Sequence, residues 1–183
     1  QAFQHIGLLP MPAALSLSLL NYVLRPERWH LYLVRDHHAI SRLTNLRIYF
    51  AGFSLTTTPG KAGELVRSLF LKPYGVQYHH SAAMFFSERL ADLVAIVALT
   101  AIGFTHLPGG TAYFVILVSA LFAGLLLLRT PLPEHALRRL AHWRHDSPGL
   151  IWLSDVAASS RPFWRGRLLW QAQGLTLIAW LGE

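Results

Sequence analysis

The longest uncharged stretch of the chain limits what it can fold into. Residues 93–128 contain no Asp, Glu, Lys or Arg, and one helix of that length would measure about 54 Å at ~1.5 Å per residue. The hydrocarbon core of a bilayer is only about 30 Å thick, so we expect the stretch to fold back on itself. Turn-forming residues at 107–111 supply the reversal. The pattern predicts two membrane spans, at about 88–106 and 112–128.

The composition supports this interpretation. Hydrophobic residues make up 53% of the chain and charged residues only 14%, against ~25% charged residues in soluble domains. Further apolar runs at about 6–24 and from about 168 to 183 onward predict two more spans. Because the chain starts without Met and stops inside an apolar run, we expect residues 1–183 to be part of one larger membrane domain.

The positive charges are concentrated at the ends of the predicted spans. The net charge is +7, and 14 of the 16 basic residues are arginines, mostly in two blocks at 25–47 and 129–167. Basic blocks that flank apolar spans are typical of cytoplasmic segments, so we do not interpret them as a nucleic-acid site. The block at 129–167 is predicted to be a cytoplasmic elbow. The absence of cysteine excludes disulfides and thiolate chemistry.

The charge pattern also constrains the segment before the second predicted span. If residues near 47 and near 80 are both cytoplasmic, the chain between them crosses the membrane an even number of times. The apolar pieces in this segment are too short for helical crossings, which need about 17–25 residues. We therefore predict a re-entrant helical hairpin at about 48–72, within an all-α, polytopic membrane helical bundle. The alternative is an amphipathic segment at 48–85 lying on the cytoplasmic face.

A polar motif interrupts the predicted hairpin. Thr58 can cap a helix that begins near Pro59, and Gly60 and Gly63 permit close approach of the backbone. The amide groups of such a helix N-terminus attract anions. Lys61 adds a positive charge nearby. The candidate substrate-binding residues in this motif are Thr58, Gly60, Lys61, Gly63, Glu64 and Arg67.

A second charged motif opens the span at 88–106. Glu88 and Asp92 are four residues apart and share a helix face, where they repel each other unless a cation lies between them. Arg89 does not share that face, so Arg67 or Lys61 is the expected cation. We predict a network that joins Glu64, Arg67, Glu88, Arg89 and Asp92. It would form either a hydrated groove for a charged lipid headgroup or a buried packing element, and Glu88 could instead lie at the membrane interface.

The sequence gives no signature of other chemistry. The histidines at 37–38, 79–80, 142 and 145 follow no metal-binding pattern, and no carboxylate is spaced to complete a set of ligands. We therefore expect neither a metal site nor a cofactor. The spacing of a phosphate-binding loop around Gly60 and Lys61 is absent. No nucleophile–base pair stands out, so no catalytic residue is predicted.

Two blocks carry a family resemblance. Residues 55–72, LTTTPGKAGELVRSLFLK, and the block with SAA at 81–83 and SERLADL at 87–93 resemble the signature of the lysylphosphatidylglycerol synthase transmembrane family. Arg28-Trp29 resembles an Arg-Trp pair of that family, and Ala179–Glu183 resembles the start of a later helix. The resemblance implies a multi-pass protein of a bacterial or archaeal cytoplasmic membrane, with flippase-like activity.

The resemblance implies a lipid substrate and leaves its identity open. The candidates are an aminoacylated phospholipid, another anionic phospholipid and a polyprenyl-phosphate carrier. Membrane lipids with anionic headgroups are the expected partners, together with a cytosolic synthetase or glycosyltransferase, and the oligomeric state stays open. The alternatives are a membrane-embedded transferase that acts on a lipid-linked substrate and a structural anchor for a cytosolic enzyme.

Overall fold

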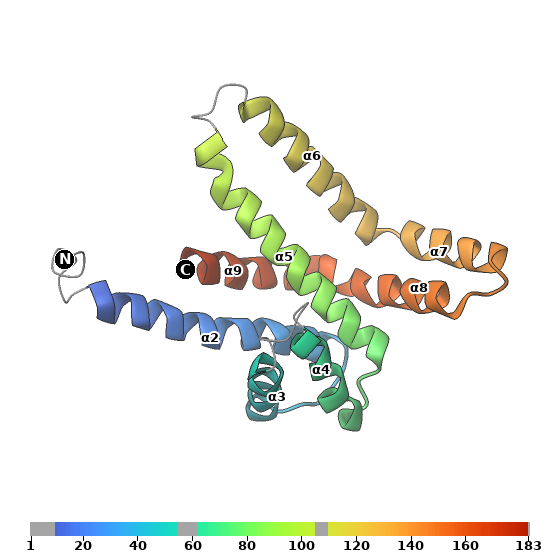
Figure 1. The fold of residues 1–183 in the computed structure, drawn as a ribbon, viewed down its shortest axis with the longest axis horizontal. Coiled ribbons are helices and arrows are strands. Elements are labelled where there is room, and N and C mark those ends of the chain that lie inside the picture. Colours follow the sequence, from blue (N-terminus) through green and yellow to red (C-terminus); the bar gives the residue numbers. More distant parts are fainter. Residues whose placement is uncertain (1–9, 55–61, 105–109, 183) are drawn as a thin grey trace.

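The computed structural model describes residues 10–54, 62–104 and 110–182, and every regular element in these ranges is helical. The prediction of an all-α fold is therefore confirmed. Three long helices form the centre of the molecule: α2 (Pro10–Arg35), α5 (Tyr78–Phe104) and α9 (Gly166–Leu181). In Figure 1, α2 and α9 run across the molecule, and α5 crosses and contacts both of them.

The other helices pack around this centre. Their order is α3 (Arg42–Ser54), α4 (Ala62–Leu71), the 3₁₀ helix η2 (Lys72–Tyr74), α6 (Gly110–Arg129), α7 (Leu132–Trp143), α8 (Pro148–Ser160) and the 3₁₀ helix η3 (Arg161–Trp164). Helices α3 and α4 contact each other, and α7 contacts α8. Gly75, at φ 85°, ends η2 in the left-handed conformation that glycine adopts without a steric penalty.

Two central helices are longer than the spans predicted at their positions. Helix α2 continues to Arg35, beyond the predicted limit at 24, and α5 starts at Tyr78, ten residues before the predicted start at 88. Both predicted limits fall next to charged residues, because charge is expected to end a span. Arg28 and Glu88 instead pair with each other inside the fold, so neither helix has to stop there.

The pair α3 and α4 occupies the predicted hairpin. At ~1.5 Å per residue, the 13 residues of α3 span about 20 Å and the 10 residues of α4 about 15 Å. Neither helix is long enough to cross a bilayer alone. Buried Asn45 of α3 donates a hydrogen bond from Nδ2 to the carbonyl oxygen of Pro26, 2.9 Å away, which ties α3 to α2. The re-entrant placement of the pair stays a prediction.

Helix α6 is the one helix among the described residues that is long and apolar enough to cross a membrane by itself. None of its most apolar window is buried inside the protein. Many of its apolar side chains, including Val115, Ile116 and Phe122, are exposed, whereas Leu125 and Leu128 on another face pack against the core. An apolar surface of this extent is typical of contact with lipid or with another protein.

The α7–α8 hairpin corresponds to the predicted elbow. Proline lies in the first turn of each helix, where its missing N–H costs nothing. Glu134 of α7 pairs with Arg161 of η3 and, at 3.4 Å, with Arg138. Arg129 Nε donates to the carbonyl oxygen of Trp164 at 2.8 Å, which fixes the end of α6 against η3. Helix α8 also contacts α5, so the elbow packs against the helical centre.

Candidate functional site

A buried arginine on α2 organises the centre of the fold. Arg28 is only 2% exposed. Its Nη2 lies 2.8 Å from Glu88 Oε1 and its Nη1 lies 2.7 Å from Asp92 Oδ1. Glu88 and Asp92 are one turn apart on α5, so the guanidinium bridges two carboxylates that would otherwise repel each other. The predicted cation between them exists, but it comes from α2.

Helix α9 completes the surroundings of Arg28. Arg28 Nη1 also donates to Thr176 Oγ1 at 2.5 Å, and the Thr176 hydroxyl donates in turn to the carbonyl oxygen of Ala172 at 2.7 Å. Trp180 Nε1 lies 3.5 Å from Asp92 Oδ1. One guanidinium therefore connects α2, α5 and α9 in the interior.

Arg67 of α4 is the second buried arginine of this network. It is 2% exposed, and its Nη2 lies 3.6 Å from Glu88 Oε2. Its guanidinium carbon lies 4.4 Å from the ring centre of Trp29 and 4.5 Å from that of Tyr49. Contact with two aromatic faces favours a cation in a desolvated site. Arg67 thereby joins α4 to α2, α3 and α5.

Arg89 extends the network toward the surface. Its side chain is 31% exposed and lies 3.5 Å from Asp92 Oδ2 and 3.7 Å from Glu88 Oε2. The expectation that Arg89 does not share their face was wrong, because its long side chain reaches back across the helix surface. Among the described residues, the network contains three guanidinium groups and two carboxylates.

The structure brings together only part of the predicted set. Arg67, Glu88, Arg89 and Asp92 meet as predicted. Thr58, Gly60 and Lys61 lie outside the described residues. Gly63 and Glu64 belong to α4, but the Glu64 side chain is outside the described part.

Arg28 was absent from the predicted site. The positive-inside rule assigns residue 25 onward to the cytoplasm, and this made Arg28 one loop arginine among several. One sequence signal points to Arg28: the spacing of Trp29, Tyr32 and Leu33 continues an apolar helix face through the first basic block. In the structure all three side chains are buried. The place of Arg28 in the Arg-Trp pair of the family resemblance points the same way.

The carboxylates of the charged network are shielded from solvent. Glu88 is fully buried and Asp92 is 7% exposed. The space beside Arg28, Asp92 and Thr176 has no room for a water molecule. In this conformation the network therefore joins helices together, and its described residues do not line a hydrated groove, which was one of the two predicted forms.

A cavity of about 520 Å³ lies nearby, between α2, α3 and the end of α9. Its polar residues include Asn21, Tyr22 and Arg25 of α2 and Tyr49 of α3. Arg25 Nε donates to Asn21 Oδ1 at 2.9 Å, which orients the guanidinium. The apolar lining comprises Ala14, Leu17, Phe53 and Leu181. The cavity thus combines a positive charge with an apolar wall.

The cavity adjoins both the network and the predicted hairpin. Arg25 is one turn before Arg28 on α2, and Tyr49 contacts Arg67 as well as the cavity. Phe53, in the last turn of α3, packs edge-on against Tyr22 with ring centres 5.6 Å apart. The motif at 58–63 follows α3 directly in the chain. The cavity therefore lies beside the charged network and next to α3, the helix that precedes the first predicted motif.

The structure also places Asp36, His38 and His80 together, with their ligand atoms within 4.8 Å of one another. The expectation that no carboxylate completes a set with these histidines was wrong. Asp36 and His80 are far apart in sequence and meet only because the end of α2 packs beside the start of α5. Burial lowers the pKa of the neighbouring His79, and His80 lowers it further.

Comparison with known proteins gives one clear match. The family model described as lysylphosphatidylglycerol synthase TM region matches residues 1–183, the whole chain. No curated protein and no solved structure matches the chain.

Proposed function

The chain belongs to the lysylphosphatidylglycerol synthase transmembrane family, and from this membership and the cavity beside Arg25 we propose that it moves a lipid between leaflets. Membership makes it a membrane domain related to lipid modification or transport. The proposed substrate is an anionic or aminoacylated phospholipid, or a polyprenyl-phosphate carrier. The cavity carries the proposal because it offers a cation at one part and an apolar wall at another, as an amphipathic lipid requires.

In this proposal the headgroup enters the cavity and the acyl chains remain in the bilayer. Arg25 attracts the phosphate, since a planar guanidinium can donate two parallel hydrogen bonds to a pair of phosphate oxygens. The motif residues Thr58, Gly60, Lys61 and Gly63 follow α3, whose Tyr49 and Phe53 line the cavity, and are proposed to contact the same headgroup. Glu64 would attract the amine of an aminoacylated lipid.

The remaining predicted site residues have a supporting role. Arg67, Glu88, Arg89 and Asp92 pair mainly with one another and with Arg28, so in this closed conformation they hold the helices around the cavity. A conformation that opens the network would expose its charges to the headgroup. The multi-pass topology in the cytoplasmic membrane and the re-entrant α3–α4 pair belong to the same proposal, as does a cytosolic synthetase or glycosyltransferase partner.

The test compares Arg25→Gln with Arg25→Lys in reconstituted vesicles. Gln removes the charge and keeps a donor for Asn21, whereas Lys keeps the charge. The assay follows loss of a fluorescent phosphatidylglycerol from the outer leaflet, with fluorescent phosphatidylcholine as the neutral lipid. Since a hydrogen bond to a charged group contributes about 1.5–3 kcal/mol, we expect R25Q to slow phosphatidylglycerol movement at least about tenfold. R25K should slow it less, because Lys keeps the charge and loses only the paired hydrogen bonds.

The matched control is Arg47→Ala, which removes an exposed arginine from α3 and should leave transport unchanged. Equal transport by R25Q and the wild-type protein would contradict the role of Arg25. A new lipid product formed by the purified chain would favour the transferase alternative. Absence of lipid movement in the wild-type protein would favour the structural anchor.

A further inference from the structure

The turn after α2 brings two potential metal ligands to the same side. His37 has φ 61°, in the left-handed region that few residues other than glycine adopt. The amides of Asp36 and His38 donate to the carbonyl oxygens of Tyr32 and Leu33, both at 3.0 Å. This turn places His38 Nε2 3.0 Å from Asp36 Oδ2. A residue in an uncommon backbone conformation thus holds an imidazole beside a carboxylate.

A third ligand comes from a different helix. His80, in the first turn of α5, places its Nδ1 2.5 Å from the same Asp36 Oδ2. That nitrogen is buried and makes no hydrogen bond in the described structure, so the contact lacks hydrogen-bond geometry. Two imidazole nitrogens therefore converge on one carboxylate oxygen, and His80 Nδ1 lies close to that oxygen without forming a hydrogen bond.

We infer that Asp36, His38 and His80 form a binding site for a divalent transition metal, with Zn²⁺ as the best-fitting ion. Two imidazoles and one carboxylate are ligands that zinc accepts, at about 2.0–2.2 Å. Bonds of that length in a tetrahedral site separate neighbouring ligand atoms by about 3.3 Å. The imidazole nitrogens of His38 and His80 now lie 3.0 and 2.5 Å from Asp36 Oδ2. Shifts of less than about 1 Å in the side-chain atoms would widen both distances to about 3.3 Å.

The site is reachable from solvent. The three side chains are 16%, 18% and 29% exposed for Asp36, His38 and His80, so they are half-buried and an ion can enter. Three protein ligands leave one tetrahedral position for water. Hard ions such as Mg²⁺ prefer oxygen ligands and fit this set less well.

The position of the site gives the metal a structural consequence. Asp36 is eight residues after Arg28, and His80 is eight residues before Glu88, which is about 12 Å along each helix. A bound ion would fasten α2 to α5 about two turns from the Arg28–Glu88 pair. The two helices would then be joined at two places, the Arg28–Glu88 pair and the metal site. Only the second connection would depend on the concentration of the metal ion. This inference does not depend on the proposed function.

The experiment measures zinc binding to the purified full chain in detergent. The purification tag must contain no histidine, because a histidine tag would bind the ion itself. Zn²⁺ is titrated against a chromophoric chelator, and Co²⁺ is added as a spectroscopic probe of tetrahedral coordination. We expect one Zn²⁺ per chain, visible Co²⁺ absorption and a rise in the melting temperature when Zn²⁺ is present.

Two variants and one control make the test specific. Even losses of groups that only support a ligand cost 10–100-fold in metal affinity, so His80→Ala and Asp36→Asn should each weaken Zn²⁺ binding at least about 100-fold. His142→Ala is the control, because His142 and Asp146 are four residues apart on the exposed elbow, with side chains 83% and 75% exposed. Its affinity should match that of the wild-type protein.

Several results would overturn the inference. Absence of stoichiometric Zn²⁺ binding by the wild-type chain would do so without any variant, even if H80A failed to fold. Equal affinity in the wild-type chain and D36N would show that zinc binds elsewhere. An equal loss of Zn²⁺ affinity in H142A would show that the ion binds at the exposed elbow instead.

Discussion

Replacing Arg28 with alanine tests whether the buried network holds the fold together. The substitution removes the cation between Glu88 and Asp92, whose nearest oxygens lie 2.8 and 2.7 Å from its guanidinium. It also removes the donor to Thr176. Two carboxylates on one face of α5 then remain in the interior, with Arg67 and Arg89 at 3.5–3.7 Å as their other cations.

The magnitude follows from the burial of the pair. Breaking a buried ion pair by removing one partner costs about 3–5 kcal/mol. Arg28 is 2% exposed and bridges two carboxylates, so we expect about 4–5 kcal/mol for R28A. For a domain of 150–250 residues, 1 kcal/mol shifts the melting temperature by about 2–4 °C. The expected decrease is therefore about 8–20 °C.

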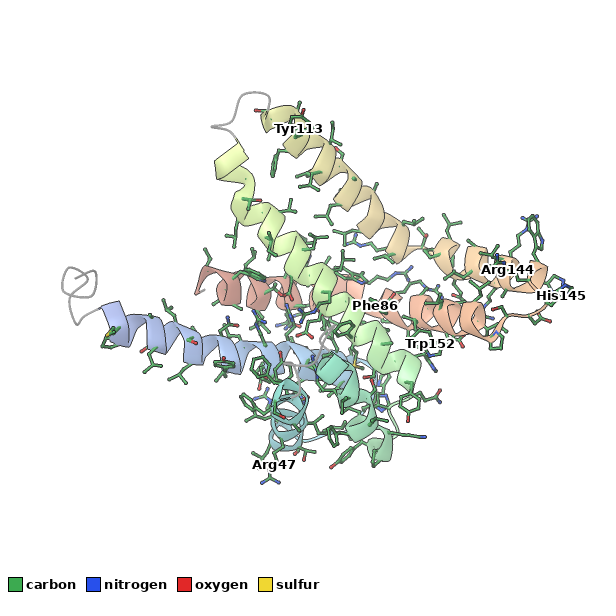
Figure 2. All side chains as sticks on the ribbon, viewed as in Figure 1. Arg47, Phe86, Tyr113, Arg144, His145 and Trp152 are labelled. Atoms are coloured by element: carbon green, nitrogen blue, oxygen red, sulfur yellow. The ribbon has the colours of Figure 1, made fainter. Side chains whose placement is uncertain are left out.

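The assay is thermal unfolding in detergent, followed by intrinsic tryptophan fluorescence. Arg47→Ala is the matched control, because Figure 2 shows Arg47 pointing away from the helical centre, and exposed substitutions usually change stability by no more than ~0.5 kcal/mol. If R28A melts within about 2 °C of R47A, the network does not stabilise the fold and the reasoning is refuted.

Two further predictions address Arg67 and the topology. Arg67→Lys keeps the charge but loses the planar group that contacts Trp29 and Tyr49. At ~0.5–2 kcal/mol per cation–π contact, the same unfolding assay should show a loss of stability of about 1–3 kcal/mol. An unchanged melting temperature would mean that charge alone matters. Because the chain has no cysteine, Tyr113→Cys at the start of α6 and His145→Cys at the tip of the elbow (Figure 2) can be labelled selectively. In right-side-out vesicles a membrane-impermeant maleimide should label Y113C and spare H145C, and the reverse pattern would contradict the predicted orientation.

Local sequence patterns predicted most of the helices. The uncharged run with its central turn residues predicted the reversal between α5 and α6, because a helix of that length cannot fit within a bilayer. The short apolar pieces around the Thr-Pro-Gly motif predicted two short helices, α3 and α4. Each of these inferences depends on residues close together in the chain.

The partners within the site were harder to predict. The repulsion between Glu88 and Asp92 correctly required a cation, but the spacing along α5 carries no information about which arginine supplies it. Arg28 is 60 residues away from Glu88, and only the crossing of α2 and α5 selects it. The same crossing brings His80 to Asp36, so the histidine cluster was equally invisible in the sequence.

The contacts of Arg28 also set an order for biosynthesis. Its partner Glu88 is translated 60 residues later and Thr176 148 residues later. At about 5–20 residues per second, Arg28 waits roughly 3–12 s for its first partner and about 7–30 s for its last. During that interval nascent α2 carries a guanidinium without the carboxylates that it contacts in the folded protein. The contacts of Arg28 with α5, and then with α9, can therefore form only after each of those helices has been translated.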